Sequence, residues 1–213
     1  MLLPLLVLAA VPLGQGILLP KPGGSFKVSL THSQLIDTHR LDPWGLDTIE
    51  YRRVMVSRFD PITPKTCRQI IVPYMTPVVA ATEDEILGPY DWPLHILDKM
   101  EIAVCDPKKG KVKKAPTVLF SPGMNTTKSF YSALAIEVAS RGYSVITIDH
   151  PFETDVVEFP DKTIAYGGHG SSKNLTFVNF ALEVRAKDIS FVLDAMALKD
   201  RGKDKVVVFG HSL

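Results

Sequence analysis

From residue 117 onward the chain alternates between short apolar runs and amphipathic stretches, and this alternation limits the possible folds more than any other feature. Buried strands are expected at residues 117–120, 143–151 and 206–209, because each run is rich in β-branched and aromatic side chains. Helices are expected between them, at residues 129–142 and 177–198. This order builds a mostly parallel sheet with flanking helices, so we expect an α/β fold.

The two expected helices differ in the signals they carry. Gly142 ends the first as a C-terminal cap. The second follows a polar, glycine-rich loop and repeats apolar residues on one face, namely Phe177, Leu182, Val184, Ile189, Val192 and Met196.

The N-terminal part of the chain has a different pattern. Residues 25–37 and 52–61 alternate between apolar and polar positions, which predicts two antiparallel strands with one face in water. A turn is expected between them at residues 42–45. From Pro61 to Pro107 prolines are frequent and periodicity is weak, so we expect an irregular excursion.

Composition excludes several classes of protein. With 213 residues, 46% hydrophobic and 22% charged, the chain can bury the core of one globular domain or most of one. The formal net charge of +1 gives no reason to expect a nucleic-acid partner. The basic run at residues 108–114 is interpreted as a solvated turn, with a patch for anionic lipid head groups as the alternative. No H-E-x-x-H, paired C-x-x-C or calcium loop is present in the sequence, so we expect no metal and no other cofactor.

Residues 1–16 are interpreted as a signal peptide cleaved near Gly16, because a Leu-rich run without charge precedes Lys21. An uncleaved anchor is the alternative. Pro4 and Pro12 interrupt the run, which leaves it shorter than the about 20 residues that a membrane-spanning helix needs. We therefore expect a secreted, extracellular protein in which residues 17–213 form the N-terminal portion of one domain.

Secretion changes the interpretation of the two cysteines. Cys67 and Cys105 would be buried free thiols in a cytosolic protein, but in an oxidising compartment a lone pair favours a disulfide. Such a bridge would be worth roughly 3–4 kcal/mol in the loop-entropy model. Two N-x-[ST] sequons, at Asn125 and Asn174, are glycosylation candidates for the same compartment.

The last residues of the sequence carry the chemical signal. Gly210-His211-Ser212-Leu213 fills four of the five places of G-x-S-x-G, the strand-to-helix turn that presents a nucleophilic serine at the edge of an α/β-hydrolase sheet. Ser212 is therefore the candidate nucleophile, and the alternative is an ordinary turn after a core strand. A serine hydroxyl needs a histidine to take its proton, and that histidine needs a carboxylate to hold its tautomer.

A tetrahedral intermediate also needs two N–H donors aimed at its oxyanion. In this fold one comes from the residue after the nucleophile, here Leu213, and the other from a loop after an earlier strand. That loop is residues 121–124, and the Met124 N–H is the candidate donor, although Pro-Gly is also ordinary in a strand-to-helix turn. Loop and elbow together are more specific than either alone.

The acid and the base of the triad are not found in this chain. The fold places them after the serine in sequence, so both are expected beyond residue 213. Asp149, His150, Asp155 and His169 would each require another order of triad residues. His211 is expected to pack beside the nucleophile rather than to act as its base.

These motifs together resemble the platelet-activating factor acetylhydrolase family, isoform II type. The resemblance runs from about Trp44 to the end and is strongest in PTVLFSPGMNTTKSFYSALAIEVASRGYSVITIDHPFETDVVEFPD, VRAKDISFVLDAM and VVVFGHSL. It implies an α/β-hydrolase cut at its nucleophile elbow, with Ser212 as nucleophile and Met124 and Leu213 as oxyanion donors. Pro122 departs from the pattern, since the animal enzymes tend to have His there.

The activity that the resemblance implies is hydrolysis of a short or oxidised acyl ester of a phospholipid, with possible association of the protein with a lipid surface. Two alternatives remain open. One is a broader carboxylesterase or lipase of the same fold, because loop and elbow do not encode the leaving group. The other is a non-catalytic, lipid-binding remnant.

Overall fold

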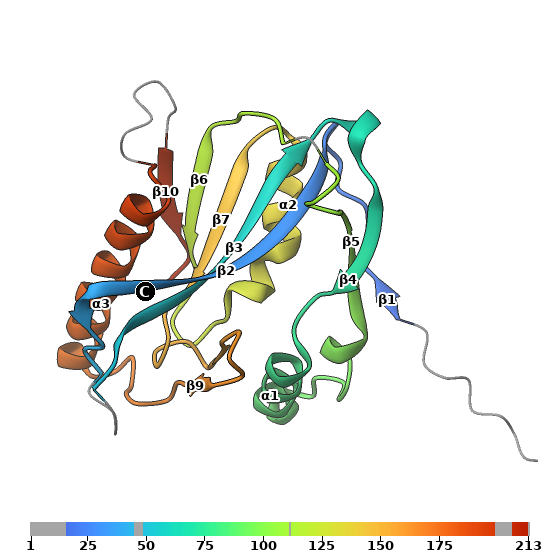
Figure 1. Ribbon diagram of the computed structural model, residues 1–213. Helices are drawn as coiled ribbons and strands as arrows, with labels where there is room; N and C mark the ends of the chain where they lie inside the picture. Colours follow the sequence, from blue (N-terminus) through green and yellow to red (C-terminus); the bar gives the residue numbers. More distant parts are fainter. Residues whose placement is uncertain (1–15, 45–48, 111, 199–205, 213) are drawn as a thin grey trace, which may run out of the picture.

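The structure is a computed structural model and describes residues 16–44, 49–110, 112–198 and 206–212. One mixed sheet forms its centre (Figure 1), in the order β1-β5-β2-β3-β7-β6-β10 with β4 paired to β5. The strands are β1 (Ile17–Leu18), β2 (Lys27–Leu41), β3 (Tyr51–Ile62), β4 (Gln69–Pro73), β5 (Met100–Cys105), β6 (Thr117–Ser121), β7 (Ser144–Asp149) and β10 (Val206–Gly210). The helices are α1 (Pro77–Leu87), α2 (Ser132–Ser140) and α3 (Leu175–Ala195), and a separate hairpin is formed by β8 (Val156–Glu158) and β9 (Ile164–Tyr166).

The parallel part of the sheet is as the alternation predicts. β7, β6 and β10 are parallel neighbours, and their carboxyl ends therefore lie at the same edge of the sheet. The chain passes from β6 to β7 through α2 and reaches β10 through α3. β2 and β3 form the predicted antiparallel pair, and β3 also runs antiparallel to β7. This mostly parallel sheet with flanking helices confirms the expected α/β-hydrolase fold class.

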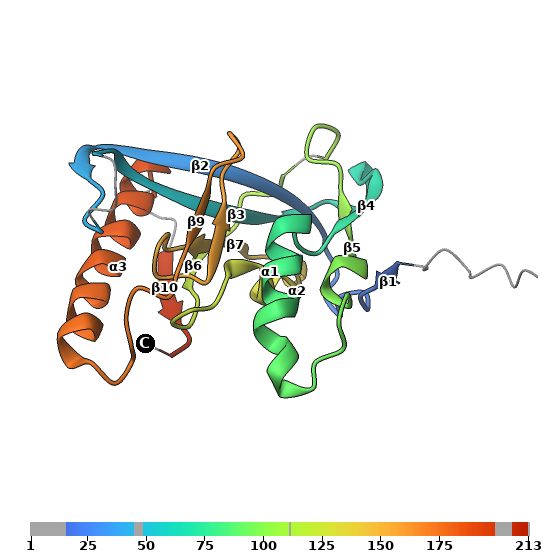
Figure 2. The same ribbon diagram turned by 90° about the horizontal axis from the view of Figure 1, so that it is seen from below.

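The two faces of the sheet are covered by different helices (Figure 2). Ala135, Ile136 and Ala139 of α2 pack with Val118 and Val145 on one face. Val192 of α3 packs with the next residue of each strand, Leu119 and Ile146, on the other. Because successive strand residues point to opposite faces, this alternation places the sheet between α2 and α3.

The prediction of a wet face is wrong for β3. Val54, Val56 and Phe59 are at most 1% exposed, although they point to both faces. β3 lies between β2 and β7 in the middle of the sheet, so helices or the β8–β9 hairpin cover it on both sides. β2 is more exposed along its second half, from Thr31 onward.

The excursion from Pro61 to Pro107 is more regular than predicted. β4 and β5 pair in an antiparallel manner and extend the sheet, and α1 lies between them in sequence. Pro77 begins α1 rather than interrupting it, because a proline at the first helical position loses no hydrogen bond. The Thr76 hydroxyl caps the helix by accepting from the Val79 N–H.

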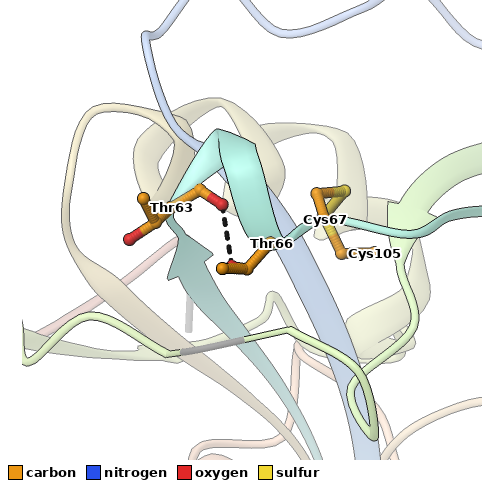
Figure 3. The surroundings of a disulfide bond; sticks show 4 residues. All are labelled: Thr63, Thr66, Cys67 and Cys105. Atoms are coloured by element: carbon orange, nitrogen blue, oxygen red, sulfur yellow. Dashed lines mark hydrogen bonds between the residues drawn. A yellow bond between two sulfur atoms is a disulfide. The ribbon is translucent and has the colours of Figure 1, made fainter.

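The predicted disulfide is present between Cys67 and Cys105, with Cα atoms 5.2 Å apart (Figure 3). Cys67 precedes β4 and Cys105 ends β5, so the bridge lies at one end of this antiparallel pair. Beside it, the Thr66 hydroxyl donates to the carbonyl of Thr63 at 2.9 Å and closes a single helical turn.

α3 has a different buried face from the one predicted. Asn174 caps it with its side-chain oxygen, and the buried positions are Ala181, Val184, Arg185, Asp188 and Val192. Leu182, assigned to the apolar face, is 46% exposed. The apolar spacing correctly predicts a helix, but two charged residues, Arg185 and Asp188, lie on its buried face. None of the helices in the described ranges is long and apolar enough to cross a membrane.

Candidate active site

Ser212 follows the last strand of the sheet, where pairing with β6 fixes the chain. Gly210 pairs with Ser121, and the His211 N–H donates to the Ser121 carbonyl at 3.2 Å. A Cβ added to Gly210 would lie 3.0 Å from that same carbonyl oxygen. A larger residue would force the Ser121 carbonyl to move, so glycine favours the close approach of the strand end to its neighbour.

The backbone of Ser212 is in the left-handed region, with φ at 52°, and the residue is exposed. A non-glycine residue in this region is strained by roughly 1–3 kcal/mol, and such strain clusters at functional sites. A nucleophile elbow requires a strained serine with an exposed hydroxyl at the end of a strand. Ser212 has this conformation, and its role as nucleophile stays a prediction.

Between Pro122 and Thr126, the loop after β6 has one N–H group without an acceptor among the described residues. The Gly123 N–H donates to the Tyr131 hydroxyl at 3.2 Å, and the Asn125 N–H to Glu153 Oε1 at 3.3 Å. The Thr126 N–H turns back to the Gly123 carbonyl at 3.2 Å. No described residue accepts from the remaining N–H, that of Met124. Met124 is thus the residue of this loop whose donor is available to a substrate oxygen, as the oxyanion hypothesis requires.

Loop and elbow are in direct contact. A Cβ on Gly123 would lie 3.3 Å from His211 Nδ1 and 3.4 Å from the His211 carbonyl. His211 Nδ1 is 2.8 Å from the Tyr131 hydroxyl, which also accepts from Gly123. His211 is therefore engaged beside the serine, as expected. The second predicted oxyanion donor, Leu213, lies outside the described residues.

A buried ion pair that sequence reasoning missed lies beneath the loop. Arg185 of α3 pairs with Glu153 and donates to the carbonyls of Pro122 and Gly123. Both charged side chains are at most 6% exposed. The sequence does contain a signal for this ion pair. Arg185 lies on the same face of α3 as Val184 and Val192, and a charged side chain on an apolar helix face needs a partner inside the protein.

A second buried network has the hydrogen-bond order of a catalytic triad. Asp188 Oδ2 is 3.0 Å from His150 Nδ1, and His150 Nε2 is 3.1 Å from Ser121 Oγ. Asp188 and His150 are fully buried and Ser121 is 8% exposed. Ser121 Oγ also accepts from Arg185 at 3.1 Å. Because these groups are enclosed and mutually satisfied, the network is structural and supports the start of the loop.

The protonation states of this network follow from its surroundings. Burial lowers the pKa of His150, and this outweighs the opposing effect of Asp188, so the imidazole is neutral near pH 7. Burial alone would raise the pKa of Asp188, but the charge of Arg52 and hydrogen bonds from His150 and Arg52 hold it well below its usual range. An ionised Asp188 accepts from His150 Nδ1–H, which leaves Nε2 to accept from the Ser121 hydroxyl.

The other upstream triad candidates are engaged elsewhere. Asp149 pairs with Lys128 and accepts from the Thr127 hydroxyl. His169 is exposed and lies 3.0 Å from the Tyr166 carbonyl. Burial, followed by the nearby charge of Glu153, raises the pKa of Asp155 to about 6. Within the part of the chain that the structure describes, no side chain hydrogen bonds to Ser212.

The two sequons occupy different environments. Asn125 is exposed, directly follows Met124 and has a left-handed backbone with φ at 57°. Asn174 caps α3 through its side-chain oxygen, which leaves the amide nitrogen open to modification.

As for metals, no group of three or more potential ligands is found among the described His, Cys, Asp and Glu residues.

Ser212 is strained and exposed just after the end of β10, and it lies beside a loop in which the Met124 N–H is free. This arrangement is the one expected of an elbow of the α/β-hydrolase class. The model of the family "Platelet-activating factor acetylhydrolase, isoform II" matches residues 98–205, about half of the chain. The chain belongs to this family.

Two relatives agree with this assignment. A protein of Arthroderma benhamiae described as "Probable 1-alkyl-2-acetylglycerophosphocholine esterase" is 41% identical over 207 residues, which cover 92% of this chain and 52% of that protein. The solved structure of a ferulic acid esterase from Streptomyces cinnamoneus matches with a TM-score of 0.70 and 26% identity, over 92% of this chain and 55% of the esterase. The chain thus spans about half the length of the curated relative it matches.

Proposed function

We propose that this protein is a serine ester hydrolase in which Ser212 attacks the ester carbonyl and the Met124 and Leu213 N–H groups stabilise the oxyanion. The observation that carries the proposal is the strained, exposed Ser212 beside a loop whose one free N–H belongs to Met124. A preorganised donor of this kind contributes roughly 10²–10³ in kcat in serine hydrolases. Family membership supports the same chemistry.

The base is assigned to another part of the protein. Among the described residues no side chain hydrogen bonds to Ser212, and the Arthroderma benhamiae relative is about twice as long as this chain. We place the histidine and its carboxylate in the region that corresponds to the second half of that relative, consistent with the order Ser, Asp, His of this fold. No step of the proposed reaction uses a metal or other cofactor.

The proposed substrate is the short or oxidised acyl ester of a glycerophospholipid. Support comes from the printed name of the relative, which describes an esterase of 1-alkyl-2-acetylglycerophosphocholine. Such a substrate is presented by lipid aggregates, so contact with a lipid surface belongs to the proposal. Secretion, cleavage near Gly16 and glycosylation of Asn125 and Asn174 are further parts of it, and the Cys67–Cys105 disulfide fits an oxidising compartment.

A second candidate is a carboxylesterase of broader or different specificity. The observation in its favour is the structural match to a ferulic acid esterase, which covers 92% of this chain. The elbow and the loop do not determine the leaving group, so both candidates share one catalytic apparatus.

The test uses the protein as its native gene encodes it, purified from its source. A fluorophosphonate probe should label it, and Ser212→Ala should abolish the labelling. Hydrolysis of 1-alkyl-2-acetylglycerophosphocholine is then compared with that of an aryl acetate and a feruloyl ester. Preference for the phospholipid supports the first candidate, and preference for the other esters supports the second. Labelling that persists in Ser212→Ala removes this serine from the mechanism, and lipid binding without any labelling indicates a non-catalytic protein.

A further inference from the structure

The guanidinium of Arg185 contacts three consecutive residues of the oxyanion loop. It donates to Ser121 Oγ at 3.1 Å, to the Pro122 carbonyl and to the Gly123 carbonyl at 3.1 Å. Its remaining partner is Glu153 Oε2, which it meets through two nitrogens. A buried helix side chain thus binds a loop more than 60 residues earlier in the chain, through one hydroxyl and two backbone carbonyls.

These contacts determine where the Met124 N–H points. The Gly123 carbonyl and the Met124 N–H belong to one peptide unit, and no described peptide bond is cis. In a trans peptide the C=O and N–H groups point in opposite directions. Because Arg185 holds the carbonyl on the buried side, the Met124 N–H is directed to the opposite side, away from the guanidinium.

Glu153 extends this control to the next peptide unit. Its Oε2 binds Arg185, while its Oε1 accepts from the Asn125 N–H at 3.3 Å. The carboxylate therefore fixes the peptide on the far side of Met124 and orients the guanidinium at the same time. The two peptide units that flank the Met124 Cα are held by one ion pair.

We propose that Arg185, oriented by Glu153, is the positioning residue that aims the Met124 N–H at the substrate oxyanion. The inference rests on the proposed function, since it assigns a role within that reaction. Arg185 touches no reacting atom and acts through the peptide it holds. The planar fork is essential, because an ammonium group does not bind two carbonyls, a hydroxyl and a carboxylate in this geometry.

A purely structural ion pair would explain the same burial, so the test must separate catalysis from folding. Arg185→Lys keeps the charge opposite Glu153 but removes the fork, and Glu153→Gln removes the orienting charge. The matched control is Arg58→Lys, on β3, whose ion pair with Asp60 is also largely buried and has no contact with the loop. All are made in the protein as its native gene encodes it.

Active sites are counted by exhaustive titration with a fluorophosphonate, so that misfolded molecules do not contribute. For Arg185→Lys and Glu153→Gln we expect kcat per titrated site to fall at least about tenfold, with KM changed less than about twofold. The affinity for a trifluoromethyl ketone, which forms an oxyanion at the serine, should fall by the same factor as kcat/KM. Arg58→Lys should keep the wild-type kcat per site even where its thermal stability drops.

An unchanged kcat per titrated site in Arg185→Lys would overturn the inference, and so would a loss of kcat without a parallel loss of ketone affinity. Failure of the proposed function gives a different result. In that case the wild-type protein itself neither hydrolyses esters nor is labelled at Ser212, and the inference falls with it.

Discussion

Glu83 is a buried carboxyl group that should make the protein less stable as the pH rises. It lies on α1, is 2% exposed, and its Oε1 has no hydrogen-bond partner among the described residues. Burial, followed by the negative charges of Asp155 and Asp149, raises its pKa from 4.5 to about 8. The folded protein therefore holds this proton at a pH where the unfolded chain has released it.

The sign and the size follow from linkage. Between pH 4.5 and pH 8 the folded state binds more protons than the unfolded state at this site, so stability falls with rising pH. The stabilisation from the protonated Glu83 is fully present below pH 4.5 and is lost as the pH rises to about 8. Above pH 8 this group no longer makes stability depend on pH. At pH 7 the loss of stability is about 3 kcal/mol, because about 2.5 pH units separate pH 7 from the ordinary pKa of 4.5 and each unit is worth roughly 1.36 kcal/mol.

Glu83→Gln mimics the protonated carboxyl group at every pH. We expect the variant to be more stable than wild type at pH 7, by up to about 3 kcal/mol, with nearly equal stability at pH 4.5. The assay is urea denaturation followed by tryptophan fluorescence at pH 4.5, 6, 7 and 8. Glu85→Gln, at an exposed position of the same helix, is the matched control. A Glu83→Gln variant with the pH dependence of wild type would refute the reasoning.

Two further predictions concern the ends of the sheet and the buried network. Replacing Cys67 and Cys105 together by serine should lower the free energy of unfolding by about 3–4 kcal/mol, because the unfolded chain regains the conformational freedom that the bridge removes. Reduced wild-type protein should match the variant in denaturant titration. Equal stability of the oxidised and reduced protein would contradict the estimate. Asp188→Asn should destabilise the fold by about 3–5 kcal/mol, since it removes the fully buried carboxylate that pairs with Arg52 and leaves that guanidinium with Asp42 as its remaining ion-pair partner among the described residues. In wild type the stabilisation from ionised Asp188 should be present above about pH 4 and be lost as the pH falls further, because the pKa of Asp188 is lowered. Acid denaturation of both proteins is followed by circular dichroism. Equal stability of wild type and Asp188→Asn above about pH 4 would show that the ion pair is unimportant.

Local sequence signals were sufficient for much of this fold. The strands at Thr117–Ser121 and Ser144–Asp149 are short β-branched runs, and Gly142, with φ at 102°, ends α2 in the conformation that glycine adopts most readily. The pairing of Cys67 with Cys105 followed from the presence of a single cysteine pair and the expectation of an oxidising compartment. The glycine and serine at residues 210 and 212 indicate a sharp turn after the strand, and Ser212 has a left-handed backbone there; its role as nucleophile stays a prediction.

Other features were misread for equally local reasons. Leu182 was assigned to the core from its helical spacing, but no spacing rule says where the buried stripe of an amphipathic helix ends. The strands at Gln69–Pro73 and Met100–Cys105 were missed because their partners are about 30 residues apart and the intervening prolines concealed the pattern. β3 was expected to be half exposed, since its alternation does not reveal that it lies in mid-sheet.

The sequence alone thus determined the three parallel strands from residue 117 onward with the two helices between them, and the turn at Ser212, because each depends on residues close together in the chain. Only the tertiary structure decided which N–H groups of the oxyanion loop are occupied and which one is free. That outcome depends on Tyr131, Glu153 and Arg185, which come from separate elements and meet only when α3 packs against the sheet. The sequence shows Arg185 as a charge on the apolar face of a helix, which indicates a partner inside the protein, but only the packed structure shows that this partner is Glu153 and that the pair contacts the loop.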